Sequence, residues 1–368
     1  MLFRFLFIGL LGIPSAFAQP TIVDLDPEDW ILPDGSKARY EEIDGRKTVE
    51  LNGKLLLKDQ TLQEGIIRVD IFGAPERSFA GLVFHKQADF YEEVYLRLHK
   101  SGSNDALQYT PVFNKESNWQ LLSQAQANPA FKMGEWNTLE IHFNSKAARI
   151  LVNGQTALVV HELNGLYQDG QLGLWSLFPS TFSNFSFEAI APEIPSPAEK
   201  PSKTSAHLIT SWEISKAYPL DRLPEMLPNL DQLNYRTAET WSDGVLPISK
   251  YTVKAVAGKF LKNSEDFAVA KLSLDCEKAT TKWLQFDFSD RGLIILNGKI
   301  LFQGDNQFRL KGLQYMGNLN PLANTIPLYL KEGKNELLIV VIEKTNGWGL
   351  IGQWLPEADE YKTKIFEN

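Results

Sequence analysis

The sequence contains a single cysteine, Cys276, among 368 residues. One thiol cannot form an internal disulfide, and it cannot supply the thiolate cluster of a structural metal site. Cys276 also lies far from the N-terminus, which excludes it as the lipidated residue of a lipoprotein. Whatever domains the chain forms must therefore be held together by packing alone.

Excess positive charge is absent as well. The formal net charge is -8, and the lysines and arginines form no basic cluster. Nucleic acid and anionic membrane surfaces both require concentrated Lys and Arg. The composition therefore predicts no nucleic-acid partner and no attachment to an anionic membrane.

Long apolar runs are missing except at the N-terminus, which has the features of a secretory signal peptide at residues 1–18. Arg4 supplies the positive charge, residues 5–13 form an apolar stretch too short to span a bilayer, and Ala16-Phe17-Ala18 is a small-residue cleavage site. We expect cleavage after Ala18; the alternative is a retained anchor helix. The sequence predicts an exported protein without membrane insertion, and it does not separate periplasm from extracellular medium.

A proline-rich segment at residues 191–205 divides the remaining chain. Such a segment cannot pack into a sheet, and we expect a semi-extended spacer that holds its neighbours apart. The predicted domains are residues 20–190 and 206–358, and residues 359–368 form a C-terminal tail. The prolines of the spacer are Pro192, Pro195, Pro197 and Pro201.

Both predicted domains show an apolar period of two, with turn residues every eight to twelve positions. This pattern is typical of antiparallel β-sandwiches rather than of alternating strands and helices. Asn153-Gly154 and Asn297-Gly298 each separate two apolar runs, and this dipeptide suits a two-residue turn with positive φ at both positions. The fold class is predicted to be all-β, with two antiparallel sandwich (jelly-roll) domains joined by the proline-rich linker.

Polar side chains interrupt the predicted strands in YLRLHKSGSNDALQYTPVFN, residues 95–114. Because side chains two apart share one face of a strand, Val94, Leu96 and Leu98 are expected to enter the core. The opposite face would carry Glu93, Tyr95, Arg97 and His99, with Gln108 on the next strand and His85 on the preceding one.

This outer face offers a candidate ligand site. Aromatic rings provide a flat apolar surface for a sugar ring, and the polar groups provide donors and acceptors for hydroxyls. The alternative is a solvated face in which Glu93 and Arg97 make ordinary cross-strand pairs. Nearby Trp119 favours a site, and the predicted ligand-binding residues are Tyr95, Arg97, His99, Gln108, Trp119 and His85.

Residues 20–190 resemble a concanavalin A-like lectin/glucanase sandwich of the laminin G-like type, especially the variety found in secreted bacterial proteins. The resemblance rests on FAGLVFH, YLRLHKSGSNDALQYTPVFN, GEWNTLEIHFNSKAARILVNG and GQLGLWSLFPSTFSNFSF in this order. It implies two curved antiparallel sheets, with a ligand on the concave face or at its rim. Related domains include sugar binders, glycosidases and 3-keto-disaccharide hydrolases.

Catalysis is not established by any motif. Glucanases of this fold carry E-x-D-x-x-E on one strand, and neither Glu42-Ile43-Asp44 nor Glu357-Ala358-Asp359 is completed by the third acid. If the chain is a carbohydrate-active hydrolase, of glycosidase or 3-keto-disaccharide hydrolase type, Glu93 and His99 are the candidate acid and base.

Metal binding has only weak candidates. Laminin G-like domains often bind calcium through rim-loop acids, which here would be Asp89 and Asp105, but these two match no complete ligand set. No cofactor is predicted.

Residues 206–358 resemble a galactose-binding-like jelly roll, a kind of domain often attached to glycosidases. The segments that carry this looser resemblance are HLITSWEISKAYP, WLQFDFSDRGLIILNGKILFQG and IPLYLKEGKNELLIVVIEKTNGWGLIGQW. NELLIVVIE is continuously apolar, which predicts a strand buried on both faces. We expect the tryptophans of this domain, Trp283 among them, to lie in its core, and we assign it no ligand site.

The favoured function is a secreted carbohydrate-binding protein whose N-terminal sandwich recognises an oligo- or polysaccharide on its concave face. The alternatives are a carbohydrate-active hydrolase that uses the same face and an adhesion or scaffold protein. The sequence does not identify the sugar.

Overall fold

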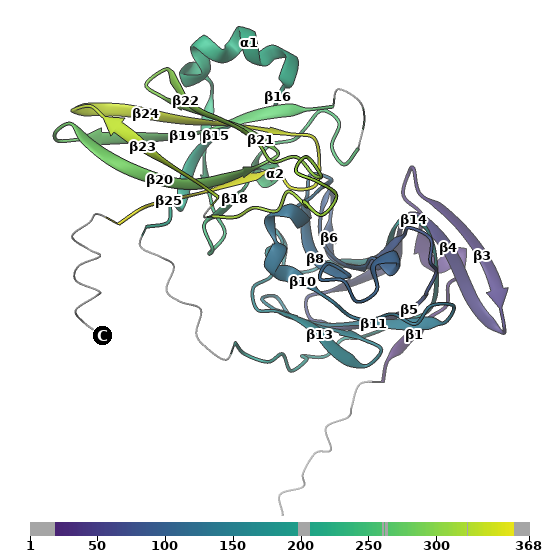
Figure 1. Ribbon diagram of the computed structural model, residues 1–368. Helices are drawn as coiled ribbons and strands as arrows, with labels where there is room; N and C mark the ends of the chain where they lie inside the picture. Colours follow the sequence, from purple (N-terminus) through teal and green to yellow (C-terminus); the bar gives the residue numbers. More distant parts are fainter. Residues whose placement is uncertain (1–18, 198–206, 260, 262–263, 322, 357–368) are drawn as a thin grey trace, which may run out of the picture.

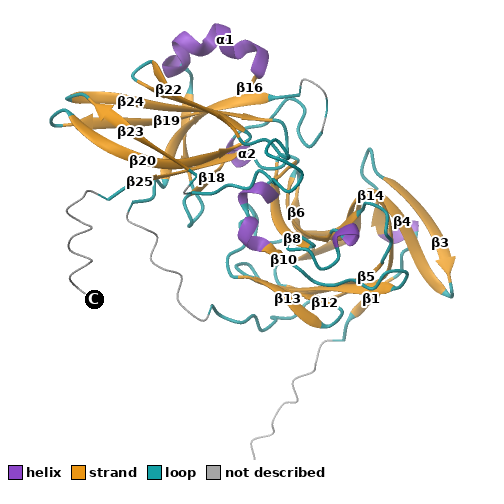
Figure 2. Cartoon of the chain, viewed as in Figure 1, coloured by secondary structure: helices purple, strands orange, loops and turns teal. Residues whose placement is uncertain are grey.

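Antiparallel strands make up most of the regular secondary structure, with a few short helices between them (Figure 2). The computed structural model describes residues 19–197, 207–259, 261, 264–321 and 323–356. The predicted signal peptide, most of the predicted spacer and the predicted tail lie outside these residues. Among the described residues no helix has the length and apolar character needed to cross a membrane.

The N-terminal domain is built from one sheet that curls around its own core (Figure 1). Its strands are β1 (Thr21–Val23), β2 (Trp30–Ile31), β3 (Lys37–Ile43), β4 (Arg46–Leu62), β5 (Gly65–Phe72), β6 (Phe79–Gln87), β7 (Phe90–Leu96), β8 (Leu107–Phe113), β9 (Glu116–Ser117), β10 (Gln126–Ala127), β11 (Trp136–Phe143), β12 (Ala148–Val152), β13 (Gln155–Val160) and β14 (Gly170–Glu188).

Strand β14 connects the two layers of this domain. Its first half pairs with β6 and its second half with β5, while β4 runs along both halves. The register shifts between Ser176 and Ser180, and Phe178 has a φ of 72° in this interval, as expected for a bulge that bends the strand. The two layers thereby enclose apolar side chains such as Leu82, Val94 and Ile141.

The C-terminal domain is a sandwich of a seven-stranded and a four-stranded sheet. Its elements are β15 (Ser211–Ser215), β16 (Tyr218–Pro219), α1 (Leu223–Met226), β17 (Tyr235–Glu239), β18 (Val245–Pro247), α2 (Ile248–Tyr251), β19 (Asp266–Cys276), β20 (Thr280–Ser289), β21 (Arg291–Leu296), β22 (Lys299–Asp305), β23 (Asn324–Leu330), β24 (Gly333–Glu343) and β25 (Gly349–Trp354). The predicted all-β class is therefore confirmed.

Several local predictions are confirmed. Asn153-Gly154 and Asn297-Gly298 have positive φ at both positions and connect β12 to β13 and β21 to β22. Strand β24 is buried on both faces, because alternate residues pack into the sandwich core and against the short helical segment around α1. Trp283 departs from the prediction: it lies 48% exposed on β20, on the same outer face of the four-stranded sheet as the exposed Tyr329 of β23.

The two domains are not held apart as the spacer predicts. Loops of the C-terminal domain lie against the end of the N-terminal domain near β6 and β8 (Figure 1). Trp241, Leu319 and Ile351 from the second domain belong to the same apolar cluster as Phe113 from the first. The prediction was wrong because it considered the linker alone, whereas burial of apolar surface on both domains favours contact.

Buried polar contacts add specificity to this interface. The Ser249 hydroxyl donates to Asn118 Oδ1 at 2.7 Å, and Gln120 Nε2 donates to the Met316 carbonyl at 2.9 Å. Asn118, Gln120 and Ser249 are all fully buried, so the loss of either bond would leave a buried polar group without a hydrogen-bond partner. These bonds therefore favour this relative position of the two domains.

A buried ionic cluster lies in the same interface. Lys254 Nζ is 3.9 Å from Glu116 Oε1 and donates to the Glu343 carbonyl oxygen at 3.0 Å. The Glu116 carboxylate also accepts from the Gly258 amide at 2.7 Å and from the Thr345 hydroxyl at 3.1 Å. A carboxylate of the first domain is thus held by three groups of the second.

Replacing Lys254 by Met is expected to destabilise the whole protein, because Glu116 would remain buried without its cation. Removal of one partner of a buried pair costs about 3–5 kcal/mol. Urea unfolding would measure the loss, with Lys299→Met on the exposed β21–β22 hairpin as the matched control. Equal stabilities of the two variants would contradict the assigned role of Lys254.

Candidate functional site

A pocket of about 390 Å³ lies between the outer face of the N-terminal sheet and loops of the C-terminal domain. The first domain contributes side chains from β4, β6, β7, β9 and β14. The second contributes Phe308, Arg309 and Met316 from the loop after β22, and Thr345 and Asn346 from the β24–β25 turn. The volume falls in the range of small-molecule sites.

Strand β7 and the residue that follows it place three of the predicted site residues in this pocket. Glu93, Tyr95 and Arg97 line it, whereas Val94 and Leu96 pack into the core on the other side. The alternation predicted from the sequence holds up to Leu96, where the strand ends. The chain then turns through a short 3-10 helix, Leu98–Lys100, and His99 still lines the pocket.

Arg97 forms the wall of the pocket and is only 3% exposed. Its guanidinium donates to the Tyr95 hydroxyl at 3.2 Å and to the Asp105 carbonyl oxygen. The guanidinium carbon lies 5.1 Å from the centre of the Tyr95 ring and 5.5 Å from that of Trp119. The cation and the two aromatic rings therefore hold one another in place.

Aromatic rings cover much of the remaining wall. The Trp175 ring on β14 packs on Tyr95, with centroids 5.1 Å apart. Phe308 meets Trp119 edge to face, with centroids 6.0 Å apart and an angle of 89° between the planes. These two rings come from different domains, so the aromatic wall is complete only when the domains are in contact.

Glu93 is the one carboxylic acid that lines the pocket among the described residues. It is 2% exposed, and its Oε2 atom has no hydrogen-bond partner in the described part of the chain. Burial raises the pKa of Glu93 to about 8, although Lys54 and a hydrogen bond from Ser117 oppose the rise. A buried acid with a free oxygen at a pocket wall can donate a proton or a hydrogen bond to a ligand near neutral pH.

Lys54 on β4 is the cationic neighbour of Glu93. Burial lowers the pKa of Lys54, and the charge of Glu93 acts in the opposite direction. The ammonium group lies 4.6 Å from the centre of the Tyr91 ring. The floor of the pocket therefore holds an acid and an amine whose pKa values are displaced toward each other.

His99 lies at the edge of the pocket with its orientation set by the backbone. Its Nδ1 atom is 3.1 Å from the Ser78 carbonyl oxygen and 3.4 Å from the Ser78 amide nitrogen, so the Ser78 backbone holds the ring through Nδ1. Burial lowers the pKa of His99, and the charges of Arg77, Lys100 and Arg97 act in the same direction. The neutral ring is thus the favoured form at pH 7.

Two predicted site residues lie elsewhere. Gln108 is fully buried beneath the sheet edge, where its amide donates to the Tyr109, Leu122 and Ala125 carbonyl oxygens. Its side chain does not line the pocket, although its backbone is paired with Tyr95 as the alternation requires. Gln108 therefore acts as framework, because neighbouring loops close over this end of β8.

His85 is the second correction. A register shift between Phe84 and Gln87 and a φ of 49° at His85 turn its ring away from the outer face. The ring lies beside Phe143, and its nitrogens contact Glu92 Oε2 at 2.7 Å and the Gln63 carbonyl oxygen at 3.0 Å. Simple alternation failed here because a bulge reverses the faces.

The weak metal candidates do not meet. Asp89 pairs with Lys115 at 3.6 Å, and Asp105 pairs with Lys100 and faces Arg97 at 3.9 Å. Within the described ranges no three His, Cys, Asp or Glu side chains form a group able to hold a metal ion. Both aspartates serve as counterions of the lysines and arginines beside the pocket.

Part of the site comes from distant segments that no sequence pattern predicts. Lys54 and Trp175 reach the pocket from β4 and β14, and Arg309 reaches it from the other domain. Neither periodicity nor spacing relates these positions to β7. The strand pairing of β14 with β6 and the contact between the domains bring them together.

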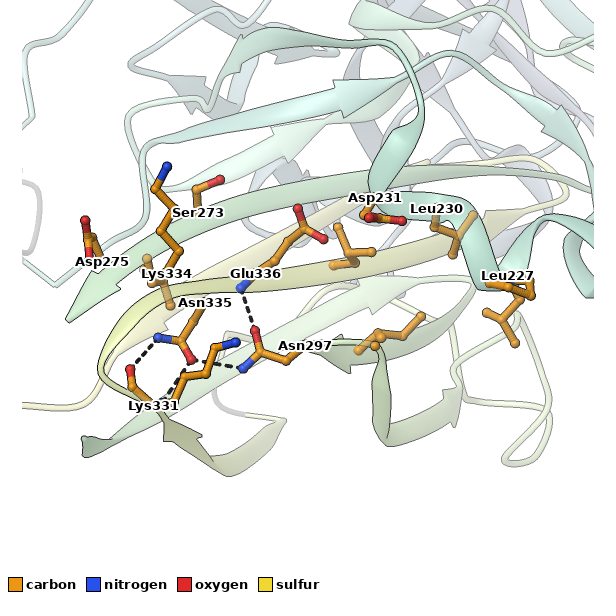
Figure 3. Close-up of a pocket in the computed structure, with 15 residues that line it drawn as sticks. Leu227, Leu230, Asp231, Ser273, Asp275, Asn297, Lys331, Lys334, Asn335 and Glu336 are labelled. Atoms are coloured by element: carbon orange, nitrogen blue, oxygen red, sulfur yellow. Dashed lines mark hydrogen bonds between the residues drawn. The ribbon is translucent and has the colours of Figure 1, made fainter. Parts of the chain in front are cut away.

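A second hollow of about 630 Å³ lies in the C-terminal domain beside β24 (Figure 3). Asn335 donates to the Lys331 carbonyl oxygen at 2.8 Å, and Asn297 donates to Asn335 Oδ1 at 2.9 Å. The Asn297 Oδ1 atom accepts from the Glu336 backbone amide at 3.0 Å. These amides are occupied in holding two turns together, so we assign this hollow a structural role.

Comparison with known proteins identifies the domain that carries most of the interdomain pocket. Residues 25–179 match the model of the 3-keto-alpha-glucoside-1,2-lyase-like domain family. The resemblance predicted for the N-terminal domain is confirmed over this stretch, which includes β7 and Trp119. The galactose-binding-like resemblance of the second domain stays a prediction. None of the curated proteins matches the chain.

Solved structures with similarity to the chain include three carbohydrate-related proteins. A carbohydrate-binding module, CBM66, from Bacillus subtilis is 13% identical with a TM-score of 0.33 over 44% of this chain and 95% of its own. A putative glycosyl hydrolase from Parabacteroides distasonis is 14% identical with a TM-score of 0.33 over 44% and 89%. A β-1,3-1,4-glucanase from a mouse hindgut metagenome is 10% identical with a TM-score of 0.32 over 45% and 95%.

Replacing Glu93 by Gln is expected to change the pH dependence of stability. Since the folded-state pKa of about 8 lies above the ordinary 4.5, the native protein holds this proton while the unfolded chain loses it, and stability falls from pH 4.5 to 8. Glutamine has no proton to lose. The stability of Glu93→Gln relative to the parent should therefore rise over this window, by on the order of 3–5 kcal/mol at pH 8.

Thermal and urea unfolding of both proteins between pH 5 and 8 would measure this difference. Glu42→Gln on the exposed strand β3 is the matched control and should show no such trend. A difference between Glu93→Gln and the parent that stays constant with pH would show that Glu93 ionises normally.

Proposed function

We propose that the protein is an exported saccharide-binding protein whose ligand lies in the pocket between the two domains. The family match supports a carbohydrate-related role for the N-terminal domain. Export rests on the signal-peptide features of residues 1–18, and periplasm and extracellular medium are equally compatible with them. The proposal moves the site from an open sheet face to a partly covered pocket.

The observation that carries the proposal is the convergence of rings and fixed polar groups in one hollow. Trp119, Trp175 and Tyr95 offer apolar faces on which a pyranose ring can stack. Arg97, His99 and Glu93 provide polar groups that are already held by neighbouring atoms. Preorganised donors lower the entropic cost of binding a ligand that must give up good hydration.

The pocket favours binding over a hydrolysis mechanism that uses two carboxylates. Both common glycosidase mechanisms use a pair of acids on either side of the scissile bond. In the part of the chain that the structure describes, Glu93 has no carboxylate partner across this pocket. The walls are charged and aromatic rather than a flat apolar patch, so the adhesion or scaffold alternative gains no support from them.

Replacing Trp119 by Ala is expected to weaken saccharide binding about fivefold, because stacking on a ring contributes about 1 kcal/mol. The measurement is a glycan array with the full chain, followed by calorimetry on any saccharide that binds. Trp136→Ala is the matched control, since Trp136 lies in the same domain, also contacts an arginine and a phenylalanine, and does not line the pocket.

Equal losses in the two tryptophan variants would contradict the proposed place of the ligand. If the folded protein binds no saccharide on the array, saccharide binding itself is contradicted.

One observation favours a carbohydrate-active enzyme as the second candidate. Glu93 lines the pocket, is buried with one oxygen that has no hydrogen-bond partner in the described residues, and has a pKa of about 8, which suits a general acid at neutral pH. His99, neutral and fixed through Nδ1, is the available base. Such an enzyme would rely on one carboxylic acid rather than on a pair.

Incubation of the bound saccharide with the protein, followed by product analysis, separates the two candidates. If turnover occurs, Glu93→Gln should lower kcat at least 100-fold with little change in KM, because proton transfer contributes 10²–10⁴-fold. Binding without products would leave recognition as the function. Full turnover by Glu93→Gln would exclude Glu93 as the acid.

A further inference from the structure

Positive charge gathers around the pocket of a chain that is negative overall. Six cationic side chains line it, against the single acid Glu93. They are Lys54, Arg77, Arg97, Lys100, Lys115 and Arg309. The formal net charge of the whole chain is -8, so this concentration is a local feature.

Part of this charge is compensated close to the pocket. Asp105 lies beside both Lys100 and Arg97, and Asp89 lies beside Lys115. Lys54 faces Glu93, whose carboxyl loses most of its negative charge at neutral pH because burial raises its pKa. The remaining cations therefore outnumber the charged carboxylates at the site.

Arg77 and Arg309 are the two cations with no carboxylate partner in the described residues. Arg77 lies on the rings of Phe79 and Phe178, at 5.7 and 5.6 Å from their centres. Arg309 lies on Phe308 at 4.9 Å. Both guanidinium groups rest on aromatic rings, which leaves their five N–H donors free for a planar anion.

The two arginines come from different domains. Arg77 precedes β6, and Arg309 lies in the loop after β22, where its φ of 64° is held by hydrogen bonds to the Tyr315 carbonyl oxygen and from the Gly312 amide. An anionic group that enters the pocket would thus meet a cation on either side. Clefts lined by charge of one sign attract ligands of the opposite sign.

We propose that the ligand of this pocket is an acidic saccharide, whose carboxylate or sulfate groups bind Arg77 and Arg309 while its rings stack on Trp119 and Trp175. This inference rests on the proposed saccharide-binding function and specifies its ligand class. The rings supply affinity for the sugar, and the arginines discriminate charged units from neutral ones.

Calorimetry with the full chain can test how the charge of the saccharide affects its affinity while the sugar backbone stays the same. Oligogalacturonides are compared with the same oligomers after methyl esterification, and sulfated galactan oligomers with their desulfated forms. We expect the charged member of one pair to bind at least tenfold more tightly than its neutral counterpart. The two pairs distinguish carboxylate from sulfate.

The binding of the charged member should also weaken with salt, and the double variant Arg77→Gln/Arg309→Gln should lose at least tenfold in affinity. Arg39→Gln, which removes one exposed cation of β3 outside the pocket, should bind as the parent does. The neutral member should respond little to the double variant, because its stacking contacts remain.

The outcomes separate this inference from the function on which it depends. Equal binding of charged and neutral members, or preference for the neutral one, would overturn the acidic ligand and leave saccharide binding standing. Charge-selective binding that the double variant retains would overturn the assignment to Arg77 and Arg309. Failure of every saccharide of a broad array to bind would overturn both proposals.

Discussion

The contact between Glu116 and the second domain is the constraint on which the site depends. Glu116 lies in the short strand β9, three residues past the end of β8, and its carboxylate is held by Lys254, Gly258 and Thr345. The same stretches of the second domain, around Gly258 and Thr345, also line the pocket. A buried charge tolerates little displacement, so the interface that satisfies Glu116 also fixes the distance between the walls of the site.

Much of the fold follows from local sequence signals. Asn-Gly dipeptides placed two hairpins correctly, and the uninterrupted apolar run in β24 correctly indicated a strand covered on both sides. These signals are local because φ and side-chain alternation depend only on neighbouring residues. The arrangement of the domains was not predictable in this way, since it depends on complementarity between surfaces distant in the chain.

The candidate site was predictable to a similar extent. Alternation along β7 correctly put Tyr95 and Arg97 on one face, and Trp119 was recognised by its nearness in sequence. The prediction from alternation failed at His85, where a bulge in the strand exchanges the two faces. It also failed at Gln108, where a loop covers the sheet. Lys54, Trp175 and Arg309 left no signal because only tertiary packing brings them to the pocket.

The shared apolar cluster has a consequence for how this protein can be dissected. Trp241, Val245, Leu319 and Ile351 complete a core whose other members belong to the N-terminal sandwich. A fragment that ends at the linker would expose this apolar surface to water. It would also lack the pocket residues that the second domain contributes. The prolines therefore mark a boundary of the covalent chain only, and both sandwiches are needed to bury this cluster and to complete the lining of the pocket.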